Sequence, residues 1–304
     1  MPTRLLLPFV LVSFAANSLI TRHVVRGGML DAGLVTSVRF LAGAAALVLL
    51  ALAFGERPQV RRTHLVPALW LGVYAVCISY GYEHIGAAAG TFVFYATVLV
   101  TLVAHDVARR VPVPRTRLVG AAVALAGLGV LASTSVSTVT PLGVLLLAAT
   151  GAAWGLYTAA GRGVPDPRIA STGNFLVLAA VLLPFTAALA TTDVDVTAAG
   201  VAWAAVMGAG TTAFAYVAWY ACQRSLSATQ AGTVQLAIPV LTAAGAVVLL
   251  GEQISLQLAV AAVLVALGMW LAQGGGAGTY TARARRKRAA TGAATDPPDA
   301  PSLT

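Results

Sequence analysis

The sequence has little charge and few residues suited to catalysis or metal binding. Only 10% of its 304 residues are charged, whereas 59% are hydrophobic. Soluble domains are about one quarter charged, so this composition excludes an ordinary water-soluble domain. The two cysteines have no partner at metal-ligand spacing, and the four histidines stand apart from one another. We therefore expect no catalytic residue, no metal and no cofactor, because an enzyme needs such groups in clusters.

Long apolar runs dominate the sequence instead. The mean hydropathy is +0.85, and the runs contain about twenty residues, enough for a helix to cross a bilayer. Because a helix satisfies its own backbone in lipid, the runs predict an all-α integral membrane protein with ten transmembrane helices. The first run resembles a signal peptide, but Phe14–Leu19 is echoed by Gly151–Leu156, which favours a first span. The predicted spans are Leu5–Thr21, Val35–Phe54, Leu65–Tyr82, Ala87–His105, Thr116–Ala132, Leu142–Gly161, Ile169–Ala190, Ala198–Cys222, Ala228–Leu250 and Leu256–Ala272.

The positive charges alternate with the same ten spans. Cytoplasmic loops accumulate Lys and Arg, and with the N-terminus inside, sixteen of the nineteen basic residues fall on the cytoplasmic side. Arg22 and Arg26 fall outside, and Arg39 lies within a span. We expect a bacterial inner-membrane protein with both termini in the cytoplasm and no nucleic-acid partner. The sixteen residues are Arg4, Arg57, Arg61, Arg62, Arg109, Arg110, Arg115, Arg117, Arg162, Arg168, Arg224, Arg283, Arg285, Arg286, Lys287 and Arg288.

The chain also contains an internal repeat. His84–Thr91 matches Arg224–Ala231 in residue type and in place, and each segment leads into an apolar span and then a helix rich in Ala, Gly and Val. Because five spans is an odd number, the second copy has the opposite orientation in the membrane. We expect two inverted five-helix repeats, residues 1–134 and 135–272, and a disordered cytoplasmic tail, residues 273–304. Inverted repeats of this kind are typical of secondary transporters.

Several segments resemble the EamA-type members of the drug/metabolite transporter superfamily. The second half has a glycine- and threonine-rich entry, an aromatic middle, a small-residue turn, a proline and a Gly-Glu turn, and the first half has an Arg-Phe pair. These segments are Gly208–Tyr220, Arg224–Ala228, Pro239, Leu249–Glu252 and Arg39–Phe40. The first half departs from the pattern at Ala96–Val98, where a proline is usual, and at His105–Val111, where a Leu-Gly-Glu turn is expected. The departures argue against two halves that work symmetrically.

The resemblance implies a central cavity lined by the first, third, fourth, sixth, eighth and ninth spans, with the fifth and tenth at the periphery. Polar residues inside a membrane face the protein interior, and polar and aromatic residues form stripes at helical spacing in these spans. The alternative is that these side chains only hold helices together. The candidate residues of the substrate cavity are Asn17, Arg39, Tyr74, Tyr95, Trp154, Tyr157, Tyr216, Trp219 and Gln235.

Arg39 is the most informative single residue. It lies one to two turns into the second span, where an arginine costs a few kcal/mol unless it is paired or reaches the interface. One interpretation is that Arg39 binds a carboxylate or stabilises the outer gate. The other is that it reaches outward to the interface or makes a structural pair.

Acidic residues are scarce within the spans, so a proton relay through a carboxylate in mid-membrane is not visible. Glu83 and His84 could form a titratable gate at the external mouth, because imidazole changes charge between about pH 5 and 8. A solvated turn is the alternative. Proton antiport, exchange with a counter-solute and uniport all stay open.

Among the function classes, a channel would need a selectivity motif, and the sequence contains none. The sequence favours an exporter of small amphipathic metabolites, such as amino acids or drug-like compounds, that works by alternating access across the plasma membrane. The alternative is a flippase for a lipid-linked substrate. The expected partners are a small-molecule substrate and the lipid bilayer, and homodimer formation stays open.

Overall fold

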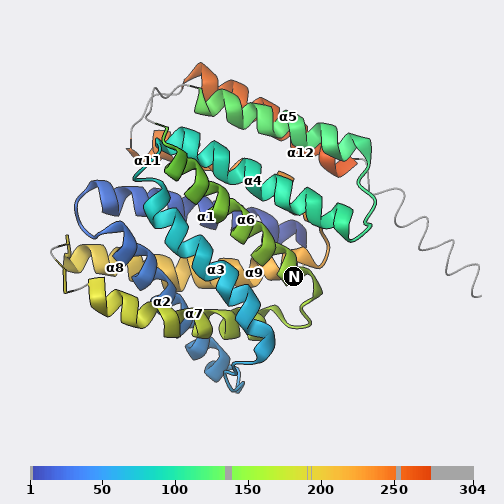
Figure 1. Ribbon diagram of the computed structural model, residues 1–304. Helices are drawn as coiled ribbons and strands as arrows, with labels where there is room; N and C mark the ends of the chain where they lie inside the picture. The colour runs from blue at the N-terminus through green and yellow to red at the C-terminus, as the bar shows by residue number, and fades with distance from the viewer. Residues whose placement is uncertain (1–2, 134–138, 190, 193, 251–254, 275–304) are drawn as a thin grey trace, which may run out of the picture.

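The computed structural model describes residues 3–133, 139–189, 191–192, 194–250 and 255–274. Every regular element within these ranges is a helix (Figure 1). Two short elements interrupt the α-helices: η1, a 3₁₀ turn at Gly161–Gly163, and η2, a π-helix at Gly208–Ala213. The α-helices are α1 Thr3–Arg26, α2 Ala32–Ala53, α3 Arg62–Gly81, α4 Ala87–Ala108, α5 Arg115–Ala132, α6 Pro141–Ala160, α7 Pro167–Leu189, α8 Ala198–Met207, α9 Phe214–Gln223, α10 Ala228–Gln235, α11 Ala237–Leu250 and α12 Leu256–Gly274.

These helices form ten segments long and apolar enough to cross a membrane, counted over the described residues. The prediction of ten spans is confirmed. The eighth span consists of α8, η2 and α9, and the ninth of α10 and α11. The structure extends two predicted ends: α1 continues from Thr21 to Arg26, and α4 from His105 to Ala108. Basic residues are favourable in the last turn of a helix, which allows such extensions. The predicted boundary after residue 134 and the tail after residue 274 lie outside the described residues.

The loops meet in two groups at the two ends of the bundle. The arginine-rich loops between α2 and α3, α4 and α5, η1 and α7, and α9 and α10 form one end, which we call the basic end. There Arg117 Nη1 donates to Ser227 Oγ over 3.0 Å, and Arg168 pairs with Glu56 at 2.6 Å. At the opposite end, Asp31 N donates to Asp195 O over 3.0 Å, which joins the loop after α1 to the loop before α8.

Small residues bring helices into close contact at two places. At one edge of the bundle α5 and α12 lie side by side (Figure 1), and a Cβ added to Gly120 would lie 2.5 Å from the Gly268 carbonyl oxygen. In the centre, α2 crosses the start of η2, and a Cβ on Gly208 would lie 2.9 Å from the Arg39 carbonyl carbon. Both crossings need glycine, as close helix contacts in membranes commonly do. The second crossing places Arg39 beside a π-helix, an element that is frequent at functional sites.

Candidate functional site

Aromatic side chains from seven helices fill the middle of the bundle. We call this group the aromatic cluster, and its ring centroids lie 4.5 to 6.2 Å apart in each contacting pair. The structure brings all six aromatic residues of the predicted cavity into this one cluster. Its members are Phe14, Phe40, Tyr74, Phe94, Tyr95, Trp154, Tyr157, Phe175, Tyr216, Trp219 and Tyr220. Because the rings touch, a solute could enter only if they separate.

Trp154 joins the two halves of the chain at the centre of the cluster. Its ring lies 5.0 Å from Tyr74 and 5.3 Å from Tyr216, measured between centroids. Its indole N–H donates to Gln235 Oε1 over 2.5 Å, and Gln235 Nε2 donates to the Ala231 carbonyl over 2.9 Å. Gln235 ends α10, because Pro239 has no N–H to donate to its carbonyl. The break in the ninth span therefore positions the amide that meets Trp154.

Asn17 is bonded to the π-helix. Its Oδ1 accepts hydrogen bonds from the Thr211 and Thr212 hydroxyls, the latter over 3.5 Å. Asn17 follows Phe14 by three residues on α1, so both side chains lie on the same face of the helix. The amide is 6% exposed. This geometry places Asn17 next to the cluster and links α1 to η2.

Arg39 is buried without a counter-charge. It is 7% exposed, and its Cζ lies 4.6 Å from the centroid of the Phe40 ring. Its Nε has no hydrogen-bond partner, and it makes no ion pair with any residue in the described ranges. The burial argues against a side chain that reaches out to the interface, and it leaves a cation beside the aromatic cluster.

Glu83 and His84 lie in the turn between α3 and α4, at the opposite end from the basic loops. The Glu83 and His84 amides donate to Tyr80 and Gly81 carbonyls over 3.2 and 3.1 Å, and Thr140 Oγ1 donates to the His84 carbonyl over 2.7 Å. The Glu83 side chain is exposed. The structure thus does not bring this pair into the aromatic cluster.

The sequence did not reveal Asp106, a fully buried carboxylate in the last turn of α4. Its oxygens accept from Arg162 Nη1 over 2.9 Å and from the Thr229 amide and hydroxyl over 2.8 and 2.9 Å. The Ala228 amide donates as well, over 3.3 Å. The start of a helix favours negative charge, so Asp106 fastens α4 to η1 and to α10. One signal was available: Asp106 follows the buried Leu102 and Leu99 at helical spacing.

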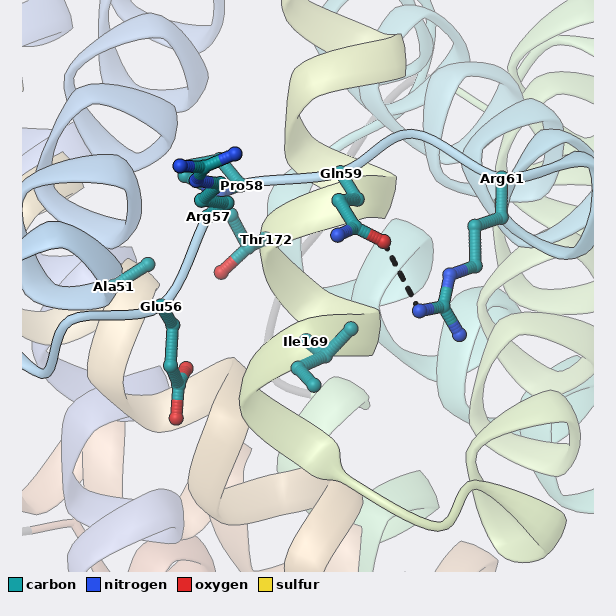
Figure 2. Close-up of a pocket in the computed structure, with 8 residues that line it drawn as sticks. All are labelled: Ala51, Glu56, Arg57, Pro58, Gln59, Arg61, Ile169 and Thr172. Atoms are coloured by element: carbon teal, nitrogen blue, oxygen red, sulfur yellow. Dashed lines mark hydrogen bonds between the residues drawn. The ribbon is translucent and has the colours of Figure 1, made fainter.

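Two pockets open near the basic end. One has a volume of about 220 Å³ and lies between the loop after α2 and the start of α7, as Figure 2 shows. Its loop residues Glu56 to Arg61 pass over Ile169 and Thr172, and Arg61 Nη2 donates to Gln59 Oε1 over 3.0 Å (Figure 2). The second pocket, of about 380 Å³, is lined by Leu6, Pro165, Asp166, Pro167, Arg168, Val217, Ala221 and Arg224. Neither is lined by a ring of the aromatic cluster.

Comparisons with known proteins agree with the resemblance. Residues 141–273, from α6 into α12, match the model of the EamA-like transporter family. An uncharacterized protein of Pseudomonas aeruginosa is 35% identical over 280 residues, which cover 88% of this chain and 93% of the relative. A solved crystal structure has the same fold at a TM-score of 0.74 and 21% identity, over 89% of this chain and 96% of the other. Together with the ten apolar helices, these matches show that the chain belongs to the EamA-like transporter family of the drug/metabolite transporter superfamily.

Proposed function

We propose that this protein is a secondary transporter that exports small amphipathic metabolites, such as amino acids or drug-like compounds, across the bacterial plasma membrane. The observation that carries the proposal is the unpaired Arg39 beside the aromatic cluster. A buried charge without a partner is costly, and a solute carboxylate would supply the partner. The rings of the cluster would hold the apolar part of the same solute.

The amides of Asn17 and Gln235 would orient the polar groups of the solute. Both are buried and both are bonded to neighbouring side chains, Asn17 to η2 and Gln235 to Trp154. A solute that enters would exchange these hydrogen bonds for its own. The aromatic rings would then separate on one side of the bundle at a time, which is the motion that alternating access requires.

Helix packing supports two inverted repeats. A two-fold axis that relates the first five spans to the last five exchanges the second span with the seventh, the fourth with the ninth and the fifth with the tenth, and exchanged spans can pack on each other across the axis. The corresponding elements do pack in this way: α2 with α7, α4 with α10, and α5 with α12. The same axis exchanges the third span with the eighth and the sixth with the first. A contact of α3 with α6 therefore corresponds to a contact of α9 with α1, and both contacts are present.

The basic end would face the cytoplasm, because cytoplasmic loops accumulate arginine. Both termini would then lie inside, and the turn with Glu83 and His84 would lie outside, where it could act as a titratable gate. Proton coupling and exchange with a counter-solute both fit this arrangement.

The proposal can be tested by comparing extracellular metabolites of a deletion strain complemented with wild type, Arg39→Ala or Arg39→Lys. We expect the wild type to raise the extracellular level of a carboxylate-bearing solute, and Arg39→Ala to abolish this export at unchanged membrane levels. Export by Arg39→Ala at the wild-type rate would overturn the role of Arg39. A change in membrane lipids without a change in any small solute would favour the flippase alternative.

A further inference from the structure

Buried polar side chains gather between α6, α7 and α9, on the basic-end side of the aromatic cluster. We call this group the polar track, and each of its members is at most 1% exposed. Its five residues are Tyr157, Ser171, Asn174, Tyr220 and Gln223. Only Tyr157 was a candidate from the sequence.

Contacts hold the track together. Asn174 Nδ2 donates to the Tyr220 hydroxyl over 3.3 Å, and this hydroxyl donates to the Tyr157 carbonyl over 3.2 Å. The Tyr157 and Tyr220 rings lie 4.9 Å apart. Ser171 precedes Asn174 by three residues and Gln223 follows Tyr220 by three, so each pair shares a helix face. Since α7 packs on α9, the two faces belong to one region.

The track lacks hydrogen-bond partners to an unusual degree. Ten buried side-chain polar atoms have no partner within the described residues, and five of them belong to the track. These are the Tyr157 hydroxyl, which lies near the Asn174 and Tyr220 side chains, then Ser171 Oγ, Asn174 Oδ1, and both Nε2 and Oε1 of Gln223. Nearly all buried polar groups in proteins are hydrogen-bonded, so this concentration calls for a polar ligand.

The polar track lies between the aromatic cluster and the second pocket at the basic end. Gln223 ends α9 at the basic end, and Tyr157 stacks on Trp154 at 5.6 Å in the aromatic cluster. The 380 Å³ pocket is lined by Val217 and Ala221 of α9, by Arg224 directly after it, and by the residues around the start of α7. The track therefore runs from the helix ends beside that pocket to the centre of the bundle.

The chemistry of the side chains defines the ligand. The track offers one carboxamide that donates and accepts, one further amide oxygen and two hydroxyls. It contains no acidic or basic side chain, so it matches no formal charge. We propose that the polar track is a second solute subsite, which binds an uncharged carboxamide or hydroxyl group of the transported solute. This inference rests on the proposed function, and the track would hold the solute after it leaves Arg39, because Gln223 lies fifteen residues along the eighth span from Gly208, the residue packed on Arg39, or about 22 Å in a helix.

A matched pair of probes tests the proposal. Benzoylglycine has an aromatic ring, a neutral amide and a carboxylate, and 4-phenylbutyrate has the same length without the amide. Binding of each to the purified full-length protein in detergent is followed by intrinsic tryptophan fluorescence, since Trp154 and Trp219 lie in the cluster. We expect benzoylglycine to bind wild type at least about tenfold more tightly, because a site with unpaired polar groups rejects a ligand that cannot satisfy them.

Two variants keep the test specific. Gln223→Met and Asn174→Leu replace the amides by apolar side chains of similar size, and we expect each to lower the preference for benzoylglycine toward equal binding while 4-phenylbutyrate binds as before. Thermal unfolding should show Gln223→Met at least as stable as wild type, because it removes two unpaired buried atoms, whereas Asn174→Leu also removes the hydrogen bond to Tyr220 and should still fold. Equal binding of the two probes to wild type, or a preference that survives both substitutions, would overturn the proposal. Unfolded variants would also overturn it, since the track would then be structural.

The outcome is separable from the proposed function. If Arg39→Ala loses metabolite export but wild type binds the two probes equally, the second subsite is contradicted and the proposed function is retained. If wild type prefers benzoylglycine but exports no solute, the polar track is a binding site and the proposed transport function is contradicted.

Discussion

Two charged side chains are buried in this bundle, and they differ in whether the described residues supply a partner of opposite charge. Asp106 is completely buried near the basic end and accepts hydrogen bonds from Arg162, Thr229 and Ala228. Arg39 is nearly as buried in the middle of the bundle, yet it has no anionic partner in the part of the chain that the structure describes. Since burying an unpaired charge is costly, we interpret Asp106 as a residue that holds the fold and Arg39 as a residue kept for a ligand.

The difference extends to the elements around each charge. Asp106 joins α4 to η1 and to the start of α10, which are elements from both halves of the chain. Arg39 lies where α2 crosses η2 so closely that Gly208 has no room for a side chain. One charge is surrounded by hydrogen-bond donors, and the other lies over the Phe40 ring at the edge of the aromatic cluster. Substitutions at the two sites should therefore affect different properties.

The largest effect is expected for Asp106→Ala. Asp106 is fully buried and Arg162 is 25% exposed, so removing the carboxylate lowers the free energy of unfolding by up to about 3–5 kcal/mol, and the start of α10 loses its partner as well. Unfolding of the purified protein in detergent, followed by intrinsic fluorescence, measures the change. Arg109→Ala is the control, because Arg109 is exposed at the same end and such surface changes stay within about 0.5 kcal/mol. If Asp106→Ala and Arg109→Ala were equally stable, Asp106 would not hold the fold together, and its contrast with Arg39 would be wrong.

Arg39→Met should affect binding instead of stability. A hydrogen bond to a charged group contributes about 1.5–3 kcal/mol, so the affinity for a carboxylate solute should fall about 10- to 100-fold. Stability should stay equal or rise, because an unpaired buried charge is removed. Arg39→Lys should give an intermediate affinity, since lysine keeps the charge without the planar fork. A strongly destabilised Arg39→Met would place Arg39 with Asp106 as a structural residue.

Trp154→Phe tests the polar contact at the centre of the cluster. The substitution keeps an aromatic ring but removes the N–H that bonds Gln235 Oε1, and leaving that oxygen unpaired costs about 1–3 kcal/mol. The double variant Trp154→Phe with Gln235→Leu should lose less stability than the sum of the single variants, because the two groups are direct partners. Additive losses in this double-mutant cycle would argue against a shared hydrogen bond.

The smallest effect is expected for His84→Gln at the opposite end. If Glu83 and His84 form a titratable gate, the transport rate of wild type should change between about pH 5 and 8, and the variant should lose that dependence. We expect a change of about twofold, because the pair does not reach the aromatic cluster and exposed charges interact weakly. Transport assays across this pH range measure it, with Glu83→Gln as the companion. A pH profile that both variants retain would remove the gate.

Hydropathy was sufficient to predict the ten helices, because lipid forces each long apolar run into a helix. The six predicted aromatic residues meet for a similar reason: stripes at helical spacing on adjacent spans turn toward the same interior. The sequence analysis did not predict that η2 is a π-helix or that the ninth span is broken where α10 ends at Gln235, four residues before Pro239. The Gly251-Glu252 turn of the resemblance lies outside the described residues.

The missed residues share a physical reason. Asp106 stands next to a run of charges at the end of a span, where its spacing from Leu99 and Leu102 was the one sign that it is buried. Ser171 and Asn174 belong to the seventh span, which the family resemblance placed outside the cavity lining. Their unpaired atoms become visible only when α7 is packed against α6 and α9. Whether a polar group is satisfied depends on neighbours distant in sequence.

The most direct test of the account compares the binding of 4-phenylbutyrate and its alcohol, 4-phenylbutanol, to purified wild type and Arg39→Met. Tryptophan fluorescence of the aromatic cluster provides the signal. The account predicts that wild type binds the carboxylate at least about tenfold more tightly than the alcohol, as one hydrogen bond to a charged group would give, and that Arg39→Met binds both equally. The same preference for the carboxylate in wild type and Arg39→Met would contradict it.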